Sequence, residues 1–160
     1  MRRETIQSTV GSVLAGTAGT AAMTLAYATE RRLRRDRQGP LDYDDSLVPG
    51  AIVASIMHLG HVTAREDNEL GLALRWSYGS VFGLWHGVLH RRIAEPWASA
   101  IFGATLMSAT LSLFPLLGRT PAPWRWPVDV MATSLGTHAV YVAAVASVDD
   151  AVGRRAARRG

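Results

Sequence analysis

Residues 71–92, GLALRWSYGSVFGLWHGVLHRR, decide the fold that this sequence predicts. Glycines recur in this stretch at a strict spacing of four, at Gly79, Gly83 and Gly87, with aromatic and branched residues between them. Glycines spaced by four share one face of a helix, and in an apolar helix such a face lets another helix approach closely. The stretch therefore predicts a membrane helix that packs through its glycines.

Outside this stretch, charged residues gather in short blocks between apolar runs. Five runs contain no Asp, Glu, Lys or Arg, and they cover residues 5–29, 46–64, 76–90, 96–118 and 130–148. A helix needs about 20 apolar residues to cross the hydrocarbon core of a bilayer. A soluble bundle would carry a polar stripe on each helix, and such a stripe is hard to find in residues 98–117. We predict an all-α, polytopic membrane protein, a compact bundle of four to five membrane-embedded helices at 5–30, 46–64, 71–92, 96–118 and 127–150.

The whole chain, 1–160, is expected to form one integral membrane domain, with connectors at 30–45 and 119–127 and a basic tail at 151–160. It contains no Cys, which excludes disulfides, thiolate metal sites and cysteine nucleophiles. All 17 basic residues are Arg, and they cluster beside apolar runs instead of along a helix face. We expect the blocks at 31–37 and 154–159 to contact anionic lipids, and we expect no nucleic-acid partner.

Counting arginines compares two topologies. If residues 46–64 cross the bilayer, five spans place eleven arginines on one side and five on the other, with Arg75 in the membrane. The positive-inside rule then places the C-terminus in the cytoplasm. If residues 46–64 re-enter or lie on the membrane, four spans leave eight arginines on each side and give no orientation. The count favours five spans, and four spans remain the alternative.

All five histidines fall within or at the ends of predicted membrane helices. Imidazole is costly in lipid unless it pairs or faces a polar cavity, and it can ligate a metal or haem iron or carry a proton. Two pairs have a spacing that places both rings on one helix face. The candidates for cofactor or metal binding are His58, His61, His86, His90 and His138. Only His86 and His138 are expected to lie deep, where a lone histidine can also simply bond a neighbouring carbonyl or hydroxyl, and we expect no cofactor.

Two charges lie at the edges of predicted spans. Arg75 can snorkel to the lipid headgroups, or it can pair with Asp129 and tie the central helix to the last one. Together with His86 and His138, these two residues outline a candidate polar path.

The glycine face of the central helix has a counterpart in the first helix. Gly11, Ala15 and Gly19 share one face there, and they are the predicted partner of Gly79, Gly83 and Gly87. Such faces, of the glycine-zipper kind, can instead form a seam between copies of the chain.

Enzyme motifs are absent, since the chain has no GxSxG, Walker loop, HExxH or dinucleotide fingerprint. The sequence therefore favours a non-enzymatic membrane protein, an accessory, assembly or stress-related component with a membrane-complex partner or a second copy of itself. One alternative is a small transporter, channel or proton-linked protein that uses intramembrane His and Arg. A further alternative is a membrane protein with a His-ligated haem or metal.

Two segments resemble a known family. The pattern GSVLAGTAGTAAMT in the first helix, followed by an Arg/Glu block, and the pattern WSYGSVFGLWHGVL in the central helix resemble the YagU-like group of small bacterial inner-membrane proteins. Where such proteins carry His before the Tyr-Gly pair and Tyr after the second glycine, this chain has Arg75-Trp76 and Trp85-His86. The resemblance implies a bacterial plasma-membrane protein linked to acid or envelope stress, and it transfers no catalytic residue.

Overall fold

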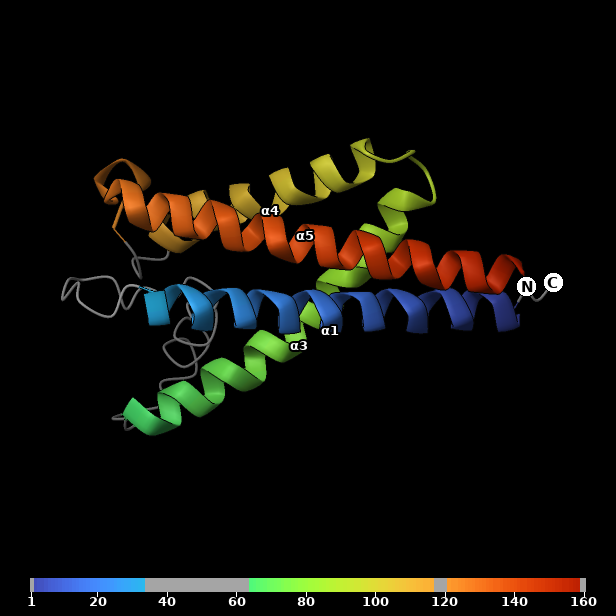
Figure 1. The fold of residues 1–160 in the computed structure, drawn as a ribbon, viewed down its shortest axis with the longest axis horizontal. Helices are drawn as coiled ribbons and strands as arrows, with labels where there is room; N and C mark the ends of the chain where they lie inside the picture. Colours follow the sequence, from blue (N-terminus) through green and yellow to red (C-terminus); the bar gives the residue numbers. More distant parts are fainter. Residues whose placement is uncertain (1, 34–63, 117–120, 159–160) are drawn as a thin grey trace.

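The computed structural model describes residues 2–33, 64–116 and 121–158, and its elements within these ranges are helices (Figure 1). The predicted all-α class is therefore confirmed. The elements are α1 (Arg2–Leu33), α3 (Ala64–His90), α4 (Trp97–Leu116), the short 3-10 helix η2 (Pro123–Arg125) and α5 (Val128–Ala157). The helix predicted at 46–64 lies outside the described residues, except that Ala64 begins α3.

Three helices extend beyond their predicted ends, and α1 does so by three residues at each end. Residues 65–69, which lie between two predicted helices, form the first turns of α3. Their two Glu residues favour helix, and acidic residues suit a helix N-terminus. At the other end of the chain, α5 continues to Ala157. Arg154 and Arg155 lie in its last turn, where positive charge interacts favourably with the helix dipole.

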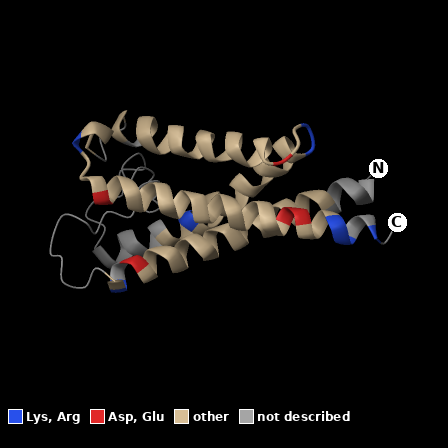
Figure 2. Ribbon diagram, turned by 45° about the horizontal axis from the view of Figure 1, so that its top comes forward, with Lys and Arg blue, Asp and Glu red and all other residues tan. Residues whose placement is uncertain are grey.

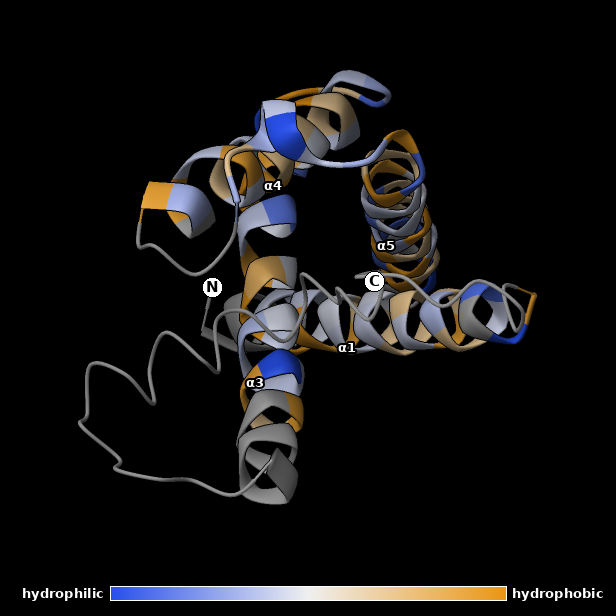
Figure 3. Cartoon of the chain, turned by 90° about the vertical axis from the view of Figure 1, so that its left-hand side faces the viewer, coloured by the Kyte–Doolittle hydropathy of each residue, from blue (hydrophilic) through white to orange (hydrophobic). Residues whose placement is uncertain are grey.

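Contacts between helices fix their relative directions. Ser12 of α1 meets Gly87 of α3, and Thr20 meets Gly79, so α1 and α3 run antiparallel. The contacts of Gly11 with Val152 and of Gly19 with Val145 make α1 and α5 antiparallel as well. Hence α3 and α5 run in the same direction, although Figure 3 shows α1 steeply inclined to α5.

These directions bear on the predicted topology. The end of α1 at Leu33 and the start of α3 at Ala64 lie at the same end of the bundle, and the two chain termini lie together at the other end (Figure 1). Residues 34–63, which connect α1 to α3, lie outside the described residues, so the choice between five and four membrane spans stays a prediction.

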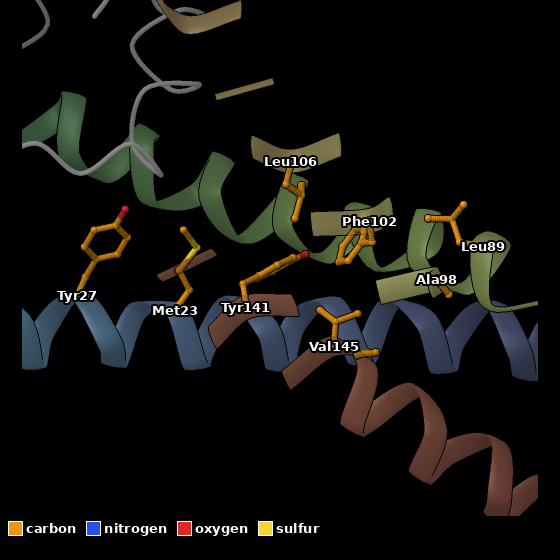
Figure 4. Packing of buried hydrophobic residues seen from close by; sticks show 9 residues of the cluster. Met23, Tyr27, Leu89, Ala98, Phe102, Leu106, Tyr141 and Val145 are labelled. Carbon is orange, nitrogen blue, oxygen red and sulfur yellow. The ribbon is translucent and has the colours of Figure 1, made fainter. Parts of the chain in front are cut away.

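The buried apolar cluster joins all four long helices (Figure 4). Phe102 of α4 lies at its centre, fully buried, with its ring centroid 5.9 Å from that of Tyr141 on α5. Tyr141 in turn donates a hydrogen bond of 2.5 Å to the carbonyl oxygen of Gly79 on α3. The other members of the cluster are Ala15, Met23, Tyr27, Leu89, Ala98, Leu106 and Val145.

Backbones meet directly where α1 crosses α3. A Cβ atom added at Gly16 would lie 2.5 Å from the carbonyl oxygen of Ser80 and 2.6 Å from that of Gly79. A Cβ atom at Gly83 would collide with the backbone of Ser12 and Gly16. The face of α1 that meets the central glycines is thus Ser12, Gly16 and Thr20, and the predicted partner face, Gly11, Ala15 and Gly19, is wrong, because Gly11 and Gly19 lie against α5.

Candidate functional site

The fully buried imidazole of His86 lies between two carboxylates from different parts of the chain. Its Nδ1 atom is 3.1 Å from Oδ2 of Asp149 on α5. Its Nε2 atom is 3.2 Å from Oε1 of Glu95, in the turn between α3 and α4, and 3.4 Å from the hydroxyl of Ser99. Phe102 covers the ring edge-on, with centroids 5.2 Å apart. We call His86, His90, Glu95, Ser99 and Asp149 the His86 cluster.

Glu95 connects the end of α3 to the start of α4. Its Oε1 atom faces both histidines, at 3.3 Å from Nδ1 of His90, while its Oε2 atom accepts the backbone N–H of Ser99 at 3.2 Å. A carboxylate at a helix N-terminus meets unpaired N–H groups and the positive end of the helix dipole. Burial acts to raise the pKa of Glu95, but hydrogen bonds from Ser99 and His90 and the attraction of His86 outweigh it and lower that pKa.

Local geometry places the two histidines of α3 on one face. Their spacing of four stacks the rings, with centroids 5.8 Å apart. The His90 side chain is 37% exposed, whereas that of His86 is fully buried, with contacts to Glu95, Asp149 and Phe102. Next to them, Arg91 donates a hydrogen bond of 2.6 Å to the hydroxyl of Ser8 on α1. The cluster is therefore held at the end of the bundle that carries both termini.

The other deep histidine has uncharged hydrogen-bond partners. In the interior, Nε2 of His138 lies 3.2 Å from the hydroxyl of Thr110, and Nδ1 lies 2.8 Å from the carbonyl oxygen of Ser134, one turn earlier on α5. Nδ1 can donate to the carbonyl and Nε2 can accept from the hydroxyl, which satisfies a neutral ring. Hydrogen bonding of this kind, to a neighbouring carbonyl and hydroxyl, is the structural role expected of a lone buried histidine.

An aromatic layer separates these two histidines. Phe102 contacts His86 on one side and Tyr141 on the other, and Tyr141 lies one turn from His138 on α5. The hydroxyl of Tyr141 is engaged by Gly79. Phe102 thus contacts both His86 and Tyr141, and the polar path predicted from Arg75, Asp129, His86 and His138 stays a prediction.

Arg75 is buried, with 4% of its surface exposed. Its guanidinium lies over the ring of Tyr27 on α1, 5.5 Å from the centroid, in a cation–π contact. Snorkelling to the headgroups is therefore wrong for this side chain. The ion pair between Arg75 and Asp129 stays a prediction.

Several functional groups were missed at the sequence level. Glu95, Ser99 and Asp149 complete the surroundings of His86, yet they come from a turn, a second helix and a third helix. One signal was available, because both topologies place the turn after His90 and the end of the last helix on the same side of the membrane. His58 and His61 lie outside the described residues.

The chemistry open to this cluster is proton exchange among imidazole and carboxylate groups. Within residues 2–33, 64–116 and 121–158, no group of three or more His, Cys, Asp or Glu side chains is arranged to hold a metal ion. Comparison with protein-family models, with curated proteins and with solved structures gives no significant match. The resemblance to the YagU-like group therefore remains a prediction, and the site has to be interpreted from its own geometry.

Proposed function

We propose that this chain is an integral membrane protein with four spans, acting as a non-enzymatic accessory or assembly component of a bacterial plasma membrane. The observation that carries the proposal is the distribution of polarity between the interior and the surface. Two helices, over Ser8–Glu30 and Val128–Arg155, are long and apolar enough to cross a membrane, and Trp97–Leu113 is a shorter apolar helix.

The described surface exposes large apolar side chains on every long helix. Orange, hydrophobic residues are visible on the outside of α4 and α5 in Figure 3. Extended exposure of this kind is unusual for a soluble monomer and is expected where lipid covers the protein. The residues include Val10, Leu14 and Leu25 of α1, Val81 and Trp85 of α3, Ile101 and Leu113 of α4, and Leu135 and Val140 of α5.

Beside its apolar cluster, the interior also buries polar and small side chains. Membrane helices associate through small residues and interhelical hydrogen bonds, because lipid supplies no hydrophobic drive between them. The hydroxyls of Thr17 and Ser80, 2.9 Å apart across the α1–α3 crossing, are an example. The buried polar residues are Ser12, Thr20, Arg75, His86, Thr110, Ser134, Thr137 and His138.

The length of α4 matches a bilayer. Twenty residues at 1.5 Å each give about 30 Å, the thickness of the hydrocarbon core. This helix carries no charge, and Figure 2 shows it without red or blue along its length. Exposed tryptophans flank it, Trp97 at its start and Trp124 in the turn that follows, as expected near lipid headgroups.

The orientation of the chain in the membrane and its lipid contacts follow less directly from the distribution of polarity. Four spans leave eight arginines on each side, so the cytoplasmic C-terminus expected from five spans has no support from the count. Arg154, Arg155 and Arg158 are exposed at the end of α5, where they suit anionic headgroups. The bacterial plasma membrane rests on the resemblance to the YagU-like group.

An accessory role fits the apolar layer between His86 and His138 better than a continuous path does. Two experiments test the proposal. The first is alkaline carbonate extraction of membranes that contain the full chain, which should leave the protein in the pellet; release into the supernatant would contradict membrane insertion. The second is proton flux into proteoliposomes at two pH values. We expect none above empty liposomes, and flux that a His86→Ala variant abolishes would overturn the accessory role in favour of a transporter.

A further inference from the structure

The hydrogen-bond partners of the two ring nitrogens of His86 decide where a proton is favourable. A neutral imidazole has one N–H donor and one lone pair. If Nδ1 carries the proton, it donates to Asp149, and the lone pair of Nε2 faces Oε1 of Glu95. If Nε2 carries the proton, it donates to Glu95, and the lone pair of Nδ1 faces Oδ2 of Asp149. In each neutral form, a nitrogen lone pair therefore faces a carboxylate oxygen, and the two repel each other. A second proton on the ring removes this repulsion.

We propose that Glu95, His86 and Asp149 form a proton-binding site, in which a proton taken up through Glu95 is held on His86 between the two carboxylates. In the loaded state, Nε2–H donates to Glu95 and Nδ1–H donates to Asp149. The proton comes from solvent, adds to the ring nitrogen that lacks one, and changes no other bond. On the ring, the proton lets both nitrogens donate, one to each carboxylate.

The exposed fraction of the side chains decreases from Glu95 to Asp149 to His86, as uptake of a proton from solvent requires. The side chain of Glu95 is 34% exposed, that of Asp149 13% and that of His86 0%. Glu95 thus offers the route from solvent to a ring that solvent does not reach. The ends of two helices assist, because α3 ends near His86 with carbonyl groups that favour a cation, and α4 begins near Glu95 with N–H groups that favour an anion.

Each helix that packs near His86 contributes neighbours to the ring. On α3, His90 stacks on the ring and bonds to Glu95. On α4, Ser99 and Phe102 contact the ring and do not titrate. Further along α5, Asp150 is paired with Arg154, one turn later. The described side chains of α1 at this level, Ser8 and Ser12, do not titrate either.

The proton is exchanged with one end of the bundle only. Phe102 contacts the ring on its inner side, and the next imidazole inward among the described residues, His138, lies one turn from Tyr141 on α5. Uptake at His86 therefore requires no flux across the membrane. The proposal is independent of the accessory role, and it would survive the discovery that the protein is soluble.

The test is the protonation of the histidine rings by nitrogen NMR. The full chain, labelled with ¹⁵N-histidine and held in nanodiscs, is measured at neutral pH, and signals are assigned by His86→Gln and His138→Gln variants. We expect His86 to carry protons on both nitrogens and His138 to carry one. His138 is the matched control, since it is also a buried histidine and its hydrogen-bond partners include a hydroxyl and a carbonyl.

A paired substitution removes the reason for the extra proton. In Glu95→Gln combined with Asp149→Asn, the amide groups can both donate and accept, so a neutral ring is satisfied and His86 should lose its second proton. If this double variant does not fold, Glu95→Gln alone, at a partly exposed position, should give the same loss. A single proton on His86 in the native chain, or two protons that persist without the carboxylates, would overturn the proposal.

Discussion

The crossing of α1 and α3 and the His86 cluster both hold α3 in the bundle, but by different physical means. At the crossing, glycines let two backbones touch, and a hydroxyl pair, Thr17 with Ser80, adds the polar contact. At the cluster, three separate elements supply an imidazole and two carboxylates. The first contact depends on shape and is indifferent to pH, whereas the second depends on where protons reside. The predictions below separate the two.

The largest effect is expected from filling the crossing. Gly83→Leu places a branched side chain where even a Cβ atom would meet the backbone of α1, so the helices must separate. Overpacking of this kind costs about 3 kcal/mol, and thermal unfolding in detergent should show the loss equally at every pH. The control is Gly136→Leu, because a Cβ at that position has nothing within 4 Å. Equal stability of the two variants would show that the crossing is not a close backbone contact.

Removing the imidazole should come next. His86→Leu leaves Asp149 and Glu95 without their shared donor, and an unsatisfied charged group costs about 1–3 kcal/mol. His138→Leu, which removes a ring with uncharged partners, should cost about 0.6 kcal/mol, as is usual for hydrogen bonds within membrane proteins. Chemical denaturation of both variants measures the difference. A loss at His138 as large as the loss at His86 would remove the special role of the carboxylates.

Acid should weaken the cluster and spare the crossing. The pKa of Glu95 is lower in the folded chain than the usual glutamate pKa. Ionised Glu95 therefore stabilises the fold at pH values above the usual glutamate pKa. This stability is lost as the pH falls through the lower pKa that Glu95 has in the folded chain. Melting temperatures should therefore fall on acidification in the native chain, and Glu95→Gln should show a shallower fall. Because Glu95 is partly exposed, the change is expected to be smaller than that of His86→Leu. Parallel curves for the two proteins would contradict the stabilising role of this carboxylate.

The smallest effect is expected from the hydroxyl pair at the crossing. Thr17→Val keeps the branched shape and removes the contact with Ser80, which should cost about 0.6 kcal/mol at any pH. Chemical denaturation against the native chain measures it. A cost comparable to that of Gly83→Leu would mean that polar bonding, and not backbone contact, holds α1 to α3.

The crossing was accessible from sequence because its signal is local. The spacing of Gly79, Gly83 and Gly87 identifies the face of α3, although the matching face of α1 required the three-dimensional packing. Ser12, Gly16 and Thr20 have the same small-residue pattern as the neighbouring glycine face, and periodicity alone does not choose between adjacent faces. Apolar runs likewise locate α4 and α5 to within a few residues at most ends.

The His86 cluster could not be predicted from the sequence, because its members are distant in sequence. His86 and Asp149 are 63 residues apart, and only the shared direction of α3 and α5 brings them together. The positive-inside count favoured five spans on the assumption that residues 46–64 cross the membrane, and all of these residues except Ala64 lie outside the described part of the chain. The described helices place both termini at one end of the bundle, and this arrangement supports the four spans of the proposal.

The most direct test of the account is the side of the membrane on which single cysteines react. The chain contains no Cys, so Arg3→Cys, Ala94→Cys, Pro121→Cys, Val140→Cys and Arg158→Cys each carry one thiol. With an impermeant maleimide on intact and on lysed cells, we predict that positions 3, 94 and 158 react from one side, position 121 from the other, and position 140, exposed to lipid, from neither. Reaction of positions 3 and 158 from opposite sides would contradict the four-span bundle, and rapid reaction of position 140 would contradict its place in the membrane.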